Sequence, residues 1–105
     1  MQHESLFSVE LDWKVELGPD NERLVVSEGR ASGAINGTFR CSAIVGTSDA
    51  FGDMRATIDT DDGATVQFRR AGGWIDLGGV ITGAGYLEPT ENGFAVVVQR
   101  QALAA

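Results

Sequence analysis

The sequence contains few of the residues on which catalysis and metal binding usually depend. Among its 105 residues there is one histidine, His3, and one cysteine, Cys41. A single cysteine excludes a disulfide within the chain. Because its neighbours alternate between apolar and polar, Cys41 is expected to be a buried structural thiol. The sequence predicts neither a metal site nor a cofactor.

Long apolar runs and an excess of basic residues are also missing. No apolar stretch approaches the ~20 residues of a membrane-spanning helix, and the opening Met-Gln-His-Glu lacks the basic region of a signal peptide. We therefore expect a cytoplasmic protein with no membrane partner. Eight basic against 15 acidic residues give a formal net charge of −7, which disfavours binding to nucleic acid.

What the sequence does have is two-residue alternation, which is clearest in residues 7–17. A period of two places alternate residues on opposite faces of a β-strand. The strand is therefore expected to turn its apolar side chains toward the core and its polar side chains away from it. The apolar set is Phe7, Val9, Leu11, Trp13, Val15 and Leu17.

Further strands follow, separated by turn residues. We expect them around residues 24–26, 54–59, 64–68, 74–87 and 94–98, with turns at 18–21, 61–63, 71–73 and 88–93. Helical periodicity is nearly absent, and the 14 glycines suit the bends and bulges of a curved sheet. The sequence thus predicts an all-β, single-domain antiparallel barrel of seven or eight strands over residues 1–105, frayed at 1–5 and 101–105.

Residues 29–45 allow two interpretations. Asn36-Gly37 is a strong signal for a two-residue hairpin turn, but such a turn mixes polar and apolar residues on both faces. A single long strand bent at its glycines keeps one apolar face, and we prefer it. Residues 94–98, Phe-Ala-Val-Val-Val, form a strand that is covered on both faces or lies at a subunit contact.

The central part of the chain resembles a known family. Gly29-Arg-Ala-Ser-Gly-Ala-Ile-Asn-Gly-Thr-Phe39, followed by Asp53, Arg55 and Thr60-Asp61-Asp62-Gly63-Ala64, is similar to segments of uncharacterised bacterial calycin-like barrel proteins (domain of unknown function thirty-two thirty-seven). The resemblance lies within about residues 25–75. It implies an antiparallel, oligomeric barrel and implies no activity.

Six residues are candidates for a ligand site. Trp74 and Tyr86 combine a large apolar body with a polar tip, and Asp76, close to Trp74 in the sequence, is grouped with them. Asp53 and Arg55 share one face of a strand, which we expect to be the outer one. Trp13 is expected in the interior. We interpret Asp59, Asp61 and Asp62 as residues of a tight hairpin and not as a calcium loop, because the EF-hand spacing is not met.

Three functions fit these features. The first is a small-molecule binding module that holds one small, partly apolar ligand near Trp74 and Tyr86. The second is a self-associating accessory or structural protein. The apolar run at residues 94–98 suggests this function, and a homodimer is favoured. The third is a cyclase- or isomerase-like enzyme that acts by confinement, with Asp53 or Asp76 as the acid–base group.

Overall fold

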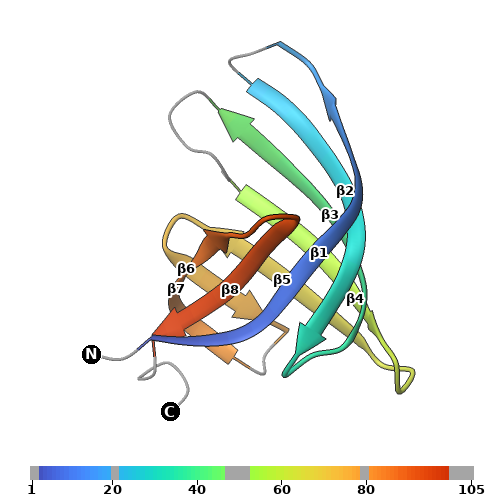
Figure 1. Ribbon diagram of the computed structural model, residues 1–105. Helices are drawn as coiled ribbons and strands as arrows, with labels where there is room; N and C mark the ends of the chain where they lie inside the picture. The colour runs from blue at the N-terminus through green and yellow to red at the C-terminus, as the bar shows by residue number, and fades with distance from the viewer. Residues whose placement is uncertain (1–2, 20–21, 47–52, 79–80, 100–105) are drawn as a thin grey trace.

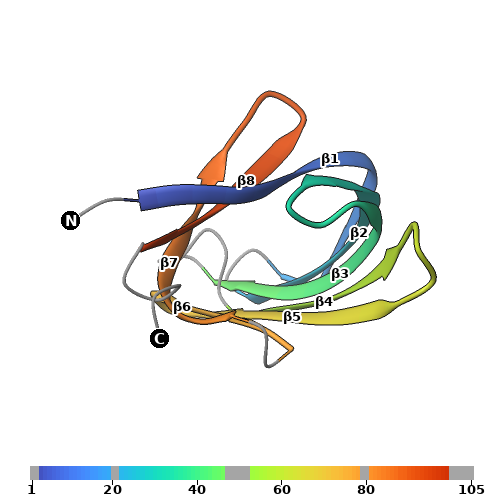
Figure 2. The same cartoon turned by 90° about the horizontal axis from the view of Figure 1, so that it is seen from below.

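The computed structural model describes residues 3–19, 22–46, 53–78 and 81–99, and in these ranges the regular structure is all β. Eight antiparallel strands follow one another around a closed barrel, and β1 pairs with β8 (Figures 1 and 2). The predicted all-β barrel is therefore confirmed. The strands are β1 (His3–Leu17), β2 (Glu22–Gly33), β3 (Gly37–Gly46), β4 (Asp53–Thr60), β5 (Thr65–Ala71), β6 (Trp74–Leu77), β7 (Ile81–Pro89) and β8 (Gly93–Gln99).

Some strand boundaries differ from those expected. β1 begins at His3, which pairs with Gln99, so the sheet includes residues 3–5, for which the sequence predicts a frayed end. The expected strand 74–87 is two strands, β6 and β7. Gly78 follows β6 with φ of 52°, a left-handed conformation that favours glycine. Residues 1–2 and 101–105 lie outside the described residues.

Phenylalanine rings occupy the middle of the barrel. Phe7 meets Phe68 edge to face with ring centroids 6.0 Å apart, and Phe39 lies between Phe68 at 6.4 Å and Phe94 at 5.6 Å. All four are almost completely buried. Edge-to-face packing at these distances suits aromatic rings, and an eight-stranded barrel is just wide enough for such side chains to fill. The interior of the barrel is therefore a packed core at this level.

The apolar run in β8 is buried on both faces within the chain itself. Phe94, Val96 and Val98 face the interior of the barrel. Ala95 and Val97 alternate with them and therefore lie on the other face, but they are only 9% and 5% exposed. Of the two interpretations of residues 94–98, coverage on both faces is the one observed. The run therefore does not require a subunit contact to explain its composition.

A bulge in β1 reverses the faces of that strand partway along its length. Leu11 pairs with Gly29, but Trp13 pairs with Glu28, so Asp12 is an extra residue opposite β2. Because an extra residue shifts a two-residue period by one, the odd-numbered side chains from Phe7 to Leu11 point inward, and those from Trp13 to Leu17 point outward.

Exposure confirms this reversal and corrects an expectation. Phe7 and Val9 are buried, whereas Trp13, Val15 and Leu17 are 45%, 47% and 57% exposed. The prediction that all six apolar residues of 7–17 face the core is therefore wrong for the last three. The sequence pattern is continuous, but the backbone is not, because Asp12 has no partner of its own on β2.

Residues 29–45 form a hairpin and not one long strand, so our preferred interpretation is wrong. β2 and β3 pair from Glu22–Gly46 to Ala31–Gly37, which leaves five residues between the last partners. The Asn36 side chain closes the turn, because its amide donates to the Gly33 carbonyl at 2.9 Å and its oxygen accepts from the Gly33 N–H at 3.2 Å.

We predict that Gly29→Ala destabilises the barrel, because Gly29 faces the bulge at close range. A Cβ at this position would overlap the Glu10 carbonyl oxygen and lie 2.8 Å from the Leu11 Cα. Overlap with backbone costs about 1–3 kcal/mol, and chemical denaturation measures the loss. Gly73→Ala is the matched control, since nothing lies within 4 Å of its Cβ. Equal stabilities of the two variants would contradict the close approach.

Candidate functional site

The structure places all six candidate residues on the outer surface of the barrel. Asp53 and Arg55 alternate with buried Met54 and Ala56, and the outward prediction for this pair is confirmed. Trp74, Asp76 and Tyr86 likewise alternate with buried neighbours, and Trp74 and Tyr86 are 53% and 40% exposed. Trp13 is turned outward by the bulge in β1, and its expected place in the interior is wrong.

One hollow on this surface brings together Arg55 and Asp76. It is an open depression of about 470 Å³, a volume in the range of small-molecule sites, and it spans the outer face of β4, β5 and β6. Neither Trp74 nor Tyr86 lines it; the Tyr86 ring instead packs edge to face against His3 at 5.6 Å. The lining residues are Arg55, Gln67, Phe68, Arg69, Asp76 and Gly78.

Two arginines lie directly opposite each other in this hollow. Arg55 on β4 pairs in register with Arg69 on β5. Like charges at directly opposite positions of a sheet are destabilising. Asp53 compensates one of them, because its carboxylate accepts from Arg69 Nη2 at 3.3 Å. Arg55 makes no hydrogen bond or ion pair with any described residue, so its guanidinium remains available to a ligand.

Arg55 also lies where three hollows meet. Toward β3, a depression of about 260 Å³ is lined by Ser42, Thr57 and Arg40 among others. Toward β2, another of about 260 Å³ includes Leu24, which is 38% exposed. The surface around Arg55 thus offers hydroxyl and amide groups on one side and an apolar side chain on the other.

The other arginines of this face already have acidic partners. Arg40 donates to Glu28 at 3.1 Å and to Asp59 at 2.7 Å. Arg30 forms a bidentate pair with Asp61, one arm of which is 2.9 Å long. This contrast singles out Arg55 among the outward-facing arginines of β2–β5.

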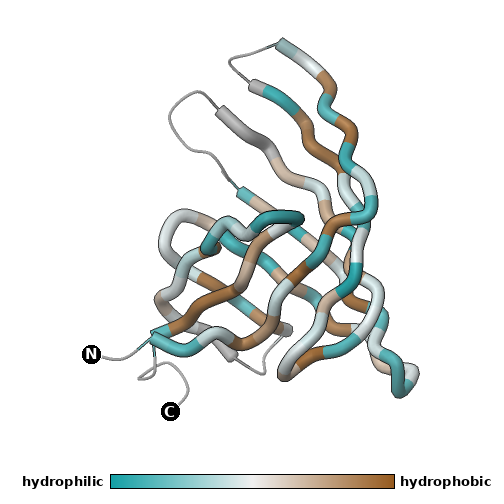
Figure 3. Tube along the Cα trace, in the orientation of Figure 1, coloured by the Kyte–Doolittle hydropathy of each residue, from teal (hydrophilic) through white to brown (hydrophobic). Residues whose placement is uncertain are grey.

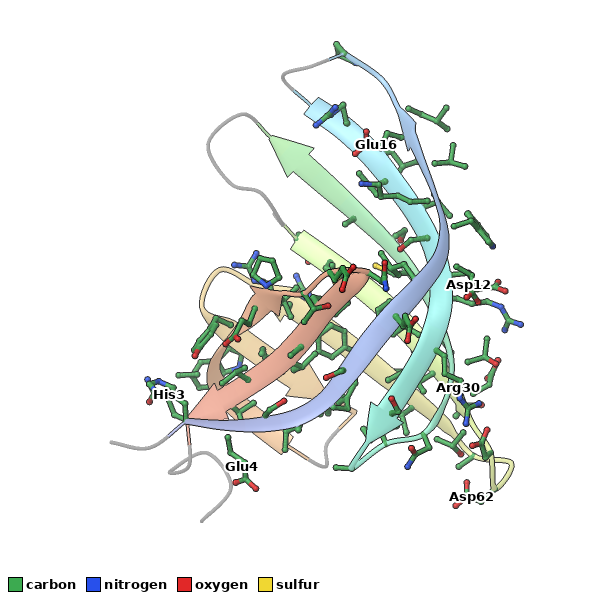
Figure 4. All side chains as sticks on the ribbon, in the orientation of Figure 1. His3, Glu4, Asp12, Glu16, Arg30 and Asp62 are labelled. Carbon is green, nitrogen blue, oxygen red and sulfur yellow. The ribbon has the colours of Figure 1, made fainter. Side chains whose placement is uncertain are left out.

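The aspartates of the β4–β5 hairpin serve the turn, as predicted. The Asp62 carboxylate accepts from the Thr60 hydroxyl, which holds the pKa of Asp62 below its usual value. The hydrogen bond from Arg30 does the same for the pKa of Asp61; Figure 4 labels Arg30 and Asp62 at this corner of the barrel. Within the described ranges, no group of three or more acidic, histidine or cysteine side chains is arranged to hold a metal ion.

Sequence reasoning missed Arg69, Gln67 and Ser42. The signal for the first two was present, because the tight turn at residues 61–63 fixes the register in which Asp59 faces Thr65 and Arg55 faces Arg69. Ser42 could not be placed, since the long strand assumed for residues 29–45 hid the register of β3 against β4. Ser42 is the direct partner of Arg55.

Cys41 is the buried thiol that the sequence predicted. Its side chain faces inward directly opposite Ser27 on β2, and both are buried. Burial raises the pKa of Cys41 to about 11, an effect partly opposed by a hydrogen bond with Ser27. Because the thiolate is the reactive form, we expect the buried Cys41 thiol to be unreactive at neutral pH.

The raised pKa predicts a loss of stability at alkaline pH. Between about pH 9 and pH 11 the folded chain keeps the Cys41 proton while the unfolded chain releases it. The free energy of unfolding therefore falls across this range, by up to about 2–3 kcal/mol. Cys41→Ala removes this contribution. The difference between the two proteins, measured by denaturation under reducing conditions, is expected to be constant below pH 8 and to shrink above pH 9; a constant difference throughout would contradict the assignment.

No family model, curated protein or solved structure matches this chain. The resemblance to calycin-like barrel proteins therefore stays a prediction, and the hollow around Arg55 has to be interpreted from its own geometry. The described part of the chain also contains no helix long and apolar enough to cross a membrane.

Proposed function

We propose that this protein is a cytoplasmic small-molecule binding module whose ligand binds the outer surface around Arg55. The ligand is small and partly apolar, and it carries a carboxylate or phosphate group. One observation supports this proposal. Arg55 lies in a hollow directly opposite a second arginine, Arg69, and makes no hydrogen bond or ion pair with any described residue.

The charge arrangement favours an anionic ligand. Arg69 shares its charge with Asp53 at 3.3 Å, so the uncompensated charge of the pair belongs to Arg55. A carboxylate placed against the Arg55 guanidinium would relieve the repulsion between the two arginines. It would form charge-assisted hydrogen bonds with Arg55, and such bonds are stronger than those between neutral groups. The hydroxyl of Ser42 and the amide of Gln67 lie beside this position as further donors.

The surroundings also favour a partly apolar ligand. Leu24 lies on β2, across β3 from β4, and lines the hollow that continues from Arg55 toward β2. A ligand whose anionic group contacts Arg55 can therefore lay an apolar body over Leu24. Because the hollows are open, they cover less of a ligand than an enclosed site does, and we expect millimolar affinity.

Benzoate is a suitable probe, since it combines one carboxylate with one apolar ring. In an NMR titration of the ¹⁵N-labelled protein we expect benzoate to shift the amide signals of β3, β4 and β5 around Arg55. Arg55→Gln is expected to weaken binding about tenfold, because a hydrogen bond to a charged group contributes about 1.5–3 kcal/mol. Benzyl alcohol, which keeps the ring without the charge, is expected to bind more weakly than benzoate.

Arg30→Gln is the matched control. It removes the same charge from the outer face, but Arg30 is held by Asp61 at the β4–β5 corner. Benzoate binding is expected to survive this change nearly intact. Equal losses in both variants would mean that only the overall charge matters, and shifts that map away from Arg55 would overturn the proposal.

Self-association is a second candidate function, now for a different reason from the one the sequence suggested. Residues 94–98 are buried within the chain, but the bulge in β1 exposes a row of apolar side chains on β1 and β2. An exposed apolar patch of this kind marks interaction surfaces. The enzyme alternative gains nothing comparable, because Asp53 and Asp76 lie on the outer face and not within the barrel.

A further inference from the structure

Half of β1 has one edge with which no described residue pairs. β8 pairs with β1 only from His3 to Glu10, and the last backbone bond on that side runs from Leu11 N to Asn92 O at 2.8 Å. Beyond this point β1 continues to Leu17 with β2 on one side, and no described residue pairs with its other edge. Figure 1 shows this part of β1 and β2 as an arm that extends past β7 and β8.

An unpaired edge offers its N–H and C=O groups to another strand. Apolar and polar residues alternate along this arm (Figure 3), and the apolar ones lie on its outer face. We call this surface the outer apolar stripe. Its members, on two paired strands, are Trp13, Val15 and Leu17 with Val26 and Leu24 opposite the last two.

The concave face of the same arm is charged. Lys14 pairs in register with Ser27 and Glu16 with Val25, so both point to the side opposite the stripe. Glu16 accepts from Arg23 at 3.5 Å and lies 3.7 Å from Lys14 Nζ. Figure 4 shows Glu16 on the concave side of the arm. The edge segment therefore alternates cleanly, with apolar residues on one face and charged residues on the other.

We propose that two copies of this chain pair antiparallel along residues 12–18 of β1, with Val15 of one copy opposite Val15 of the second. This inference rests on the second candidate function, self-association. It assigns the partner as another copy of the chain and fixes the register of the pairing.

Among the registers centred on residues 14, 15 and 16, charge complementarity selects this one. In a two-fold antiparallel pair that keeps the faces of the sheet aligned, one residue lies opposite its own copy. Centring on Lys14 places two lysines together, and centring on Glu16 places two glutamates together. Centring on Val15 instead places Lys14 opposite Glu16 of the second copy, twice by symmetry.

The apolar face agrees with the same register. Trp13 then lies opposite Leu17 of the second copy, again twice, with the two Val15 side chains between them. These three residues are about half exposed in the single chain, and pairing would cover them while extending the sheet across both barrels. Aromatic–aliphatic and opposite-charge cross-strand pairs each contribute about 0.2–1 kcal/mol.

Charge exchange tests the register. By sedimentation equilibrium we expect the unaltered protein to form a dimer. Lys14→Glu and Glu16→Lys each place like charges opposite each other, and each is expected to raise the dissociation constant at least tenfold. The double exchange Lys14→Glu with Glu16→Lys is expected to restore the dissociation constant to within a few-fold, which also shows that the single variants did not simply misfold.

Cross-linking locates the two-fold axis directly. In a Cys41→Ala background, Val15→Cys is expected to form a disulfide between copies under mild oxidation, because each cysteine faces its own copy. Lys14→Cys is the matched control, since its partner is Glu16, and it is expected to cross-link only when mixed with Glu16→Cys.

The outcomes separate this inference from self-association in general. A protein that sediments as a strict monomer overturns both. A dimer that is insensitive to the charge exchanges but is broken by Val26→Glu, on the stripe away from the edge, leaves self-association standing through face-to-face packing and overturns the edge pairing.

Discussion

The bulge at Asp12 is the constraint on which the accessible surface of this protein depends. Before the bulge, Phe7 and Val9 contribute to the core. After it, the same alternation of apolar and polar residues exposes Trp13, Val15 and Leu17 to solvent. A single extra residue is enough, because the side-chain period of a strand is two. The bulge thus divides β1 into a wall of the barrel and an arm whose apolar face has no partner among the described residues.

Glycine makes this geometry possible. Gly29 lies opposite Leu11 at the last regular pair before the bulge, and there is no room for a side chain between it and the β1 backbone. Close approach of this kind is a common reason for glycine within a strand. The glycine content of the sequence therefore reflects curvature at defined pairs, while the phenylalanine rings supply the volume that fills the interior.

The sequence predicts the fold class well, because alternation and turn residues are local signals. It predicts Asp53 and Arg55 as outward for the same reason, since Met54, Ala56 and Ile58 alternate with them. It misplaces Trp13, because a bulge leaves no mark on an alternating pattern. Nothing in residues 7–17 distinguishes Asp12 from the other polar residues of the strand.

The error over residues 29–45 has a different cause. A two-residue turn at Asn36-Gly37 would place odd-numbered residues opposite even-numbered ones, and the structure does not contain it. The observed partners, such as Ala31 with Gly37, leave an odd number of residues in the loop and so keep odd-numbered residues on the inner face of both strands. An apolar face made of the odd-numbered residues of 29–45 is therefore compatible with this hairpin as well as with one long strand. The alternation of odd- and even-numbered residues alone does not distinguish the two.

The two proposed surfaces meet at Leu24. This side chain lines the hollow that continues from Arg55, and it is also the cross-strand partner of Leu17 at the end of the outer apolar stripe. A ligand that lies over Leu24 changes the apolar area that a second copy can cover beside Leu17. Because linkage between two binding equilibria is reciprocal, any factor by which the ligand alters dimer affinity is the factor by which dimer formation alters ligand affinity. Arg55 belongs only to the ligand surface, and Lys14 and Glu16 belong only to the dimer surface. Leu24 is shared, so we expect ligand binding and dimer formation to couple at this residue.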